Sequence, residues 1–260
     1  MCRMAFLVLA SVVFGLSAGR ADAHYPMLLP SAHSIKRGEH LTLTYQWGHP
    51  YEHQLFDALV PDAFVACTPG GSQTIDLKAT LKQIALPAGE GKTVMAYQAA
   101  FSPQERGDYL FYLELPALWM EEEQEFFQDV AYVVVHVQAQ RGWDNNFFRA
   151  DDRMGIQALT RPYGLRTGMA FQALVSGRGK GLANTLVEVE HYNETPPASL
   201  PPDENITRSA KTDPNGVVTC TLTDPGWTCV AAVRSHGKNR HGEKEYPVRQ
   251  RAVFWVYVDR

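Results

Sequence analysis

Short runs of alternating or β-branched apolar residues recur along most of the 260-residue chain, and they constrain its fold more than any other feature. Glycine, proline, asparagine and aspartate separate the runs, which is the pattern of strands joined by turns. No long apolar stripe at helical spacing interrupts them. The runs cover 40–47, 92–101, 107–115, 129–139, 168–175, 184–192, 216–222, 227–233 and 251–258. The sequence therefore predicts an all-β protein built from β-sandwiches.

Two segments depart from this pattern. Residues 116–129, PALWMEEEQEFFQD, are rich in helix-forming side chains, and we expect a turn or two of helix there. Residues 141–155 are polar, aromatic and turn-rich, and we expect a linker. This linker would join two immunoglobulin- or transthyretin-like sandwiches in tandem, over 24–140 and 156–260, each of a length common for one domain.

The first 23 residues have the features of a secretory signal peptide. Arg3 precedes an apolar run over 4–16, and the small residues that end in Ala21-Asp22-Ala23 fit the A-x-A cleavage pattern. The run is shorter than the roughly 18 apolar residues of a membrane-spanning helix, and no later stretch reaches that length. We therefore expect a periplasmic or secreted protein that is not inserted in a membrane after cleavage and whose mature chain begins at His24.

The charge of the mature chain restricts its partners. Cleavage removes two arginines and one aspartate, so of 24 basic and 28 acidic residues 22 and 27 remain, a net charge of −5. Nucleic acids and anionic membranes are bound by clustered lysine and arginine. The composition therefore argues against either partner.

Three cysteines remain after cleavage, in a compartment that favours disulfides. Residues 223–226 read as a turn between two strands, which would place Cys220 opposite Cys229. A cross-strand bridge and two buried thiols are both compatible with this spacing. Cys67 would stay unpaired.

Five of the nine histidines fall early in the mature chain, at 24, 33, 40, 49 and 53. Cleavage would give His24 both an imidazole and a free α-amine, whose pKa of about 7.7–8.0 allows it to bind metal near neutral pH. The later histidines read as structural or solvated: His191 ends a strand, and His236 and His241 lie in the polar stretch 235–245, expected as a loop.

The segment Trp47-Gly-His-Pro-Tyr-Glu-His53 strengthens a metal hypothesis. The proline after His49 restricts that histidine to extended backbone. His49 and His53 would face together if the turn between them were helical, and otherwise His53 is a solvated loop residue. In the acidic run 121–125, Glu123 is the one carboxylate that we nominate as an oxygen ligand, the alternative being a solvated face.

The chain resembles the soluble periplasmic proteins grouped with NikM and NikK, a family linked to nickel and cobalt uptake and often classed as a domain of unknown function. The resemblance rests on AHYPMLLPS, GHPYE, PALWMEEE, LTRPYGLRTG, VEVEHYNE, TDPNGVVTCTLTDPGW and AVFWV, in this order. It implies an extracytoplasmic metal-binding component whose mature chain starts with histidine. His24 and His49 match that pattern, and Glu123 lies where members carry an acidic residue after an aromatic one. His53 and His191 stand where relatives carry other residues.

Three functions follow. The first is a nickel- or cobalt-binding protein, not an enzyme, that serves a membrane metal transporter and uses His24, His49, Glu123 and His53. Its nitrogen and oxygen donors without thiolate suit these ions, although the affinity order favours copper. The second is a surface or adhesion module without metal. The third is a copper-dependent oxygenase with an N-terminal histidine brace; common enzyme motifs such as G-x-S-x-G, HExxH and the P-loop do not occur.

Overall fold

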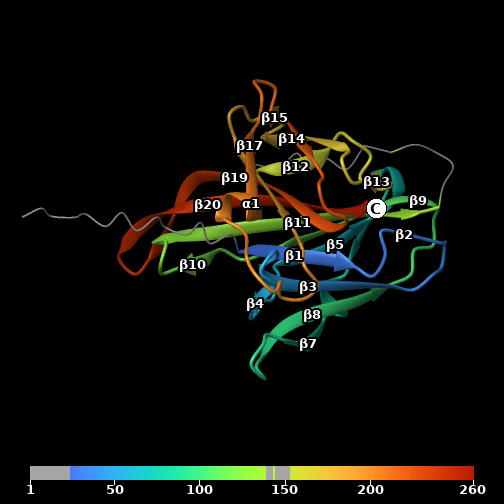
Figure 1. Ribbon diagram of the computed structural model, residues 1–260, viewed down its shortest axis with the longest axis horizontal. Coiled ribbons are helices and arrows are strands. Elements are labelled where there is room, and N and C mark those ends of the chain that lie inside the picture. Colours follow the sequence, from blue (N-terminus) through green and yellow to red (C-terminus); the bar gives the residue numbers. More distant parts are fainter. Residues whose placement is uncertain (1–23, 139–142, 144–152) are drawn as a thin grey trace, which may run out of the picture.

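The computed structural model describes residues 24–138, 143 and 153–260, and the chain there is almost entirely β-structure, as the sequence predicts. The predicted signal peptide and most of the predicted linker lie outside these residues. The strands form three sheets that stack as layers (Figure 1). In the described part of the chain no helix is long and apolar enough to cross a membrane.

One outer layer is a five-stranded antiparallel sheet in the order β1-β3-β8-β7, with β4 paired to β3. It consists of β1 (Tyr25–Pro30), β3 (Leu41–His49), β4 (Gln54–Phe56), β7 (Lys82–Pro87) and β8 (Thr93–Phe101). The other outer layer is a four-stranded sheet. It consists of β12 (Gly155–Ala158), β14 (Ala170–Gly177), β15 (Lys180–Gly181) and β18 (Val217–Thr221).

The middle layer is an eleven-stranded sheet in the order β17-β16-β19-β20-β11-β9-β5-β6, with β2 and β10 paired to β11 and β13 paired to β20. Its strands are β2 (Ser34–Ile35), β5 (Ala63–Cys67), β6 (Thr74–Asp76), β9 (Gly107–Glu114), β10 (Leu118–Met120), β11 (Glu125–Val137), β13 (Leu165–Arg166), β16 (Leu186–His191), β17 (Thr207–Lys211), β19 (Gly226–His241) and β20 (Lys244–Asp259). Short helical turns occur at Pro69–Gly71, Lys78–Thr80 and α1 (Asp203–Ile206).

The centre of the middle sheet is buried on both faces. Ala131, Val133 and Val135 of β11 pack toward the five-stranded sheet, whereas Val130 and Tyr132 pack toward the four-stranded sheet. Side chains alternate across a strand, so a strand covered on both sides needs an apolar residue at nearly every position. This explains why the residues of 129–139 are nearly all apolar.

The two sandwiches predicted over 24–140 and 156–260 share this middle sheet. β11 belongs to the first half of the chain and β20 to the second, and they pair in parallel from Phe126 opposite Val248 to Val133 opposite Trp255. Each half therefore supplies one outer layer, and both supply strands to the sheet between them.

A buried ion pair joins the halves at this seam. Asp129 and Arg251 are cross-strand partners, 4% and 3% exposed, and the guanidinium donates two hydrogen bonds of 2.7 and 2.5 Å to the carboxylate. The guanidinium also lies 4.2 Å from the centre of the Phe127 ring. The two charges can be buried because each has the other as its counter-ion and two hydrogen bonds join them.

The helix expected within 116–129 is wrong. β10 and the start of β11 form an antiparallel hairpin, and Trp119 lies opposite Phe126 with ring centroids 5.2 Å apart. Residues 121–124 make the turn, where Gln124 has a φ of 55°. Cross-strand aromatic packing outweighs the helix propensity of the glutamates.

The bridge between Cys220 and Cys229 is not formed. Residues 223–226 do connect two strands, but β18 pairs with β14 while β19 pairs with β16 and β20. The two cysteines therefore lie in different sheets, and both are free thiols. Burial raises the pKa of the Cys220 thiol to about 11, so this thiol stays protonated at neutral pH.

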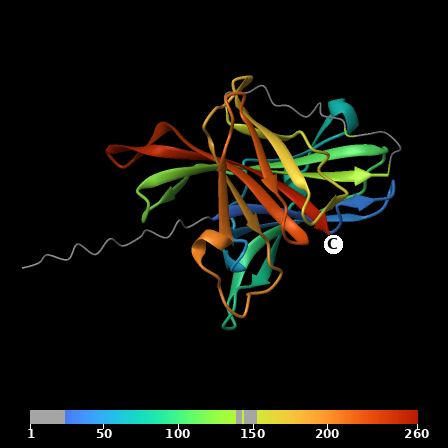
Figure 2. The ribbon, with the colours of Figure 1, turned by 45° about the horizontal axis from the view of Figure 1, so that its top comes forward.

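The loop expected over 235–245 is also wrong. β19 and β20 continue there as a two-stranded ribbon that extends past the layers beside β10 (Figures 1 and 2). Lys238 pairs with Pro247 and His241 with Lys244. Because most side chains of the ribbon are exposed on both faces, the strands show none of the apolar alternation that marks the body.

Removing one partner of the buried seam pair tests its role. In Asp129→Ala, Arg251 keeps its charge and its burial but loses its counter-ion, so we expect the free energy of unfolding to fall by about 3–5 kcal/mol. Urea denaturation measures this. The control is Glu90→Ala, which breaks a 3.5 Å ion pair with Lys92 whose side chains are 86% and 76% exposed, and which should change stability by less than about 1 kcal/mol. Equal effects of the two variants would contradict the assignment.

Candidate metal site at the start of the first strand

The register between β1 and β3 brings His24 to His49. Tyr25 lies opposite Gly48 in this antiparallel ladder, and one further step of the same register sets His24 opposite His49. Their ring centroids are 4.3 Å apart with planes at 61°. Both histidines are buried, at 9% and 8% exposure. Two of the residues nominated from the sequence therefore lie side by side.

Gly48 permits the tight turn that follows β3. Its φ is 151°, and a Cβ at this position would lie 2.1 Å from the carbonyl oxygen of Gln54 on the returning strand. Only glycine tolerates such a close backbone approach. The turn then pairs His49 with Gln54 and Trp47 with Phe56.

Aromatic rings enclose the histidine pair. His24 stacks on Trp47 with centroids 4.9 Å apart and planes at 17°, and its ring lies 5.0 Å from that of Phe56. The His49 ring lies 5.7 Å from the same phenylalanine. These contacts restrict the orientation of both imidazoles, which is a requirement for a preformed ligand pair.

The two histidines line a cavity of about 540 Å³, together with the β10–β11 turn. Glu123 lies on that turn, and its Oε2 atom is buried without a hydrogen-bond partner in the described structure. A buried carboxylate oxygen with no donor is unfavourable and calls for an explanation. The remaining lining residues are Trp47, Gln54, Phe56, Trp119, Met120, Glu121 and Glu122.

The described side chains alone do not complete a metal site. No group of three or more His, Cys, Asp or Glu side chains between residues 24 and 260, as far as the structure describes them, is arranged to hold an ion. The amine that cleavage after Ala23 would create lies on His24 itself. With the rings of His24 and His49 it would give three nitrogen donors, and Glu123 lines the same cavity.

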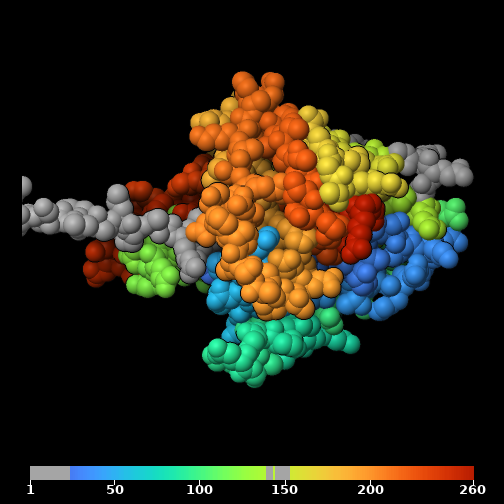
Figure 3. All heavy atoms as spheres, in the orientation of Figure 1, coloured from blue at the N-terminus to red at the C-terminus, as the bar shows by residue number. Residues whose placement is uncertain are grey.

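His53 is not part of this arrangement. The four residues 50–53 reverse the chain instead of continuing as a helix, so His49 and His53 do not share a face. His53 has a φ of 51°, and its Nδ1 lies 2.8 Å from the carbonyl oxygen of Asn193. It is absent from the lining of the histidine cavity. In Figure 3 the segment after β16 (orange) borders the region of this turn (cyan).

His191 lies in a different place, at the end of β16. Together with Trp227 and Tyr257 it lines a separate cavity of about 400 Å³. Its Nδ1 is buried and has no hydrogen-bond partner among the residues that the structure describes, and burial lowers the pKa of the ring. The structure therefore does not bring His191 to the His24–His49 pair.

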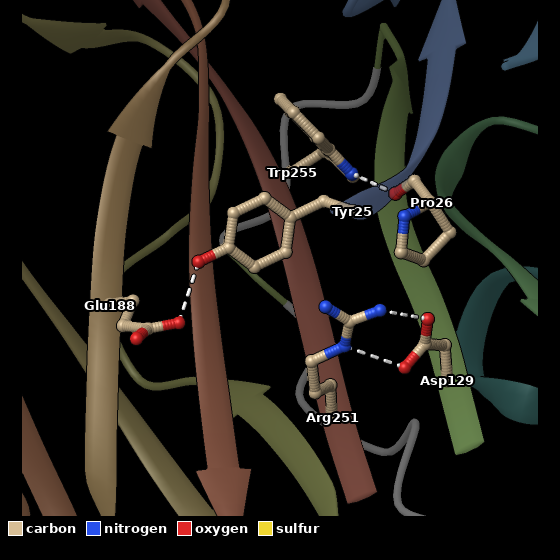
Figure 4. Close-up of polar contacts among 6 residues, drawn as sticks. All are labelled: Tyr25, Pro26, Asp129, Glu188, Arg251 and Trp255. Atoms are coloured by element: carbon tan, nitrogen blue, oxygen red, sulfur yellow. Dashed lines mark hydrogen bonds and ion pairs between the residues drawn. The ribbon is translucent and has the colours of Figure 1, made fainter. Parts of the chain in front are cut away.

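Glu188 and Glu190 of β16 form hydrogen bonds with residues next to the histidines, and the sequence alone did not single them out. The Tyr25 hydroxyl donates a 2.6 Å hydrogen bond to Glu188, as Figure 4 shows. Glu190 accepts hydrogen bonds from the Tyr51 amide at 3.1 Å and from the Thr207 hydroxyl at 2.7 Å. A signal was present, because in LVEVEHY these glutamates alternate with valines and so share one face of a strand.

Glu190 is 1% exposed, and burial raises the pKa of its carboxyl to about 8. The hydrogen bonds from Thr207 and Tyr51 lower this pKa, but burial has the larger effect. The carboxyl therefore holds its proton at neutral pH. Fold and site together define an all-β protein with a buried histidine pair where its first strand begins.

The chain belongs to the family described as "Domain of unknown function (DUF4198)", which matches residues 21–236. Among the curated proteins no match is found.

Three solved structures show weak similarity. The adhesin InvE of Yersinia pseudotuberculosis is 13% identical, with 88% of this chain and 58% of that chain covered and a TM-score of 0.23. Trypsin-activated alpha-2-macroglobulin from Escherichia coli is 11% identical, with coverages of 94% and 16% and a TM-score of 0.24. SporoSAG from Toxoplasma gondii is 11% identical, with coverages of 84% and 95% and a TM-score of 0.20. This chain thus spans little more than half of the adhesin, and at these TM-scores none of the three indicates a function.

The raised pKa of Glu190 predicts a pH dependence. The folded protein keeps this proton up to about pH 8, whereas the unfolded chain releases it near the ordinary value of 4.5. The free energy of unfolding therefore falls, by at most about 1.4 kcal/mol per pH unit, as the pH rises through this window. Glu190→Gln cannot ionise, so its stability relative to the wild type should increase from pH 5 to pH 8. Urea denaturation at both pH values measures this, and a difference independent of pH would contradict it.

Proposed function

We propose that the protein is an extracytoplasmic binding protein for a divalent transition metal, nickel or cobalt, and that it serves metal uptake. The observation that carries the proposal is the adjacency of two buried imidazoles, His24 and His49, at a cavity that Glu123 also lines. One carboxylate oxygen of Glu123 is buried and has no hydrogen-bond partner among the described residues. The signal-peptide pattern of the first 23 residues supports a periplasmic or secreted location.

The donor set favours a borderline ion. The imidazoles and the amine of His24 are nitrogen donors, Glu123 is an oxygen donor, and no cysteine lines the cavity. Soft thiolate ligands would select Cu(I), whereas imidazole suits nickel, copper and zinc. The resemblance to the NikM and NikK proteins is the reason to prefer nickel or cobalt within this group.

A cavity open at the surface suits a carrier that must release its ion. The ligands would come from the residue directly before β1, from the end of β3 and from the β10–β11 turn, so movement of the turn alone would remove the oxygen donor. The acidic residues beside Glu123 would raise the local concentration of cations. We propose a membrane metal transporter as the partner that receives the ion.

Calorimetric titration of nickel, cobalt, copper and zinc into protein that begins at His24 tests the proposal. We expect one ion per chain, and an affinity for nickel that falls by about tenfold or more, equal to about 1.4 kcal/mol, when one glycine precedes His24, because the amine then belongs to another residue. His49→Ala should have a similar or larger effect. His40→Ala is the matched control, since His40 is exposed and outside the cavity.

Two outcomes would contradict the proposal. Absence of binding by all four ions to the protein that begins at His24 would favour a surface or adhesion module without metal. Reductant-dependent oxidation of a polysaccharide by the copper-loaded protein would identify a copper oxygenase, which uses the same amine and two imidazoles.

A further inference from the structure

A single strand of the second half contacts both segments that carry the histidines. β16 and the two residues after it form hydrogen bonds with the residue next to His24 and with the turn that follows His49. The contacts join Glu188 to Tyr25, Glu190 to Tyr51, and Asn193 to Pro50, Tyr51 and His53; Tyr192 accepts a further bond from Gln46. One element therefore contacts both segments that carry the histidines.

On the His24 side the contacts are buried. The Tyr25 ring is 0% exposed, and its hydroxyl reaches Glu188 at 2.6 Å. The indole N–H of Trp255, on β20, donates a 2.9 Å hydrogen bond to the carbonyl oxygen of Pro26 (Figure 4). A bond between two side chains and a bond from a side chain to a backbone carbonyl therefore fix the two residues directly after His24.

On the His49 side the contacts fix the turn. The Tyr51 amide donates to Glu190 at 3.1 Å, and the side-chain amide of Asn193 donates to the Tyr51 carbonyl oxygen at 2.6 Å. The Asn193 amide also donates to the carbonyl oxygen of Pro50, next to His49, at 3.1 Å. The backbone of Pro50 and Tyr51 is thus held by hydrogen bonds, and these two residues directly follow His49.

We infer that β16 is the positioning element of the histidine pair, with Glu188 and Glu190 as positioning residues that set the distance between the amine-bearing residue and the second imidazole. The inference rests on the proposed function for its metal readout, but the placement of the two rings is measurable without metal. It assigns the second half of the chain a part in a site whose proposed ligands all come from the first half.

Tyr25→Phe tests the His24 side, because it keeps the ring and removes the bond to Glu188. We expect the ring-current shift that Trp47 imposes on the His24 protons in the metal-free NMR spectrum to move toward the value of free histidine, and the nickel affinity to fall by about tenfold. The control is Tyr45→Phe on β3, whose hydroxyl is buried and forms no side-chain hydrogen bond within the part of the chain that the structure describes. It should leave the shift and the affinity unchanged.

A pair of variants at Glu188 separates positioning from loss of fold. Glu188→Gln keeps an acceptor for the Tyr25 hydroxyl and should retain the His24 shift and the affinity, whereas Glu188→Ala should lose both. At the other end Glu190→Gln should likewise keep the His49 resonances in place, and Glu190→Ala should displace them. Rescue by the amide is not expected if these residues act only through their charge.

The outcomes distinguish the two proposals. Wild-type shift and affinity in Tyr25→Phe and Glu188→Ala would overturn the positioning role while leaving metal binding intact. A wild-type protein that binds no nickel, but whose His24 shift is lost in Tyr25→Phe, would overturn the proposed function and retain β16 as the element that places the rings.

Discussion

All six residues of β1 pair with β3, which ties the start of the described chain to that strand, and this antiparallel register is what puts one imidazole against another. A slip by one residue would turn every side chain of β1 to the opposite face, and because all six are buried, the packing on both faces of the strand would be lost. Burial of β1 on both faces therefore fixes the position of His24. Burial of β1 supplies the free energy that holds His24, the residue directly before the strand, in place.

The position of the two histidines also requires that the two halves of the chain stay together. β16, which contacts both histidine-bearing segments, reaches them only because it belongs to the same middle sheet as β11, through β19 and β20. The pair of Asp129 and Arg251 lies at the seam between β11 and β20, and the apolar side chains around it pack on both faces. The geometry of the proposed site therefore depends on the pairing of β11 with β20 that holds the middle sheet together.

The strands of the body could be predicted from the sequence because burial on one or both faces leaves an apolar pattern, as in 129–139. The ribbon over 235–245 could not, since most of its side chains are exposed and only the ladder makes it a strand. Helix propensity misled at 116–129, where the pairing of Trp119 with Phe126 decides the structure. His24, His49 and Glu123 were nominated by residue type and resemblance, but their common cavity depends on strand register, which the sequence does not reveal. His53 shows the same limit, because its place beside His49 required a helical turn, and the chain reverses there instead.

X-ray absorption at the nickel edge, on the loaded protein that begins at His24, measures the proposed coordination most directly. The account predicts a first shell of nitrogen and oxygen atoms without sulfur, with outer-shell scattering from two imidazoles that falls to one in His49→Ala. A spectrum with one imidazole in the wild type, or one unchanged by His49→Ala, would contradict it.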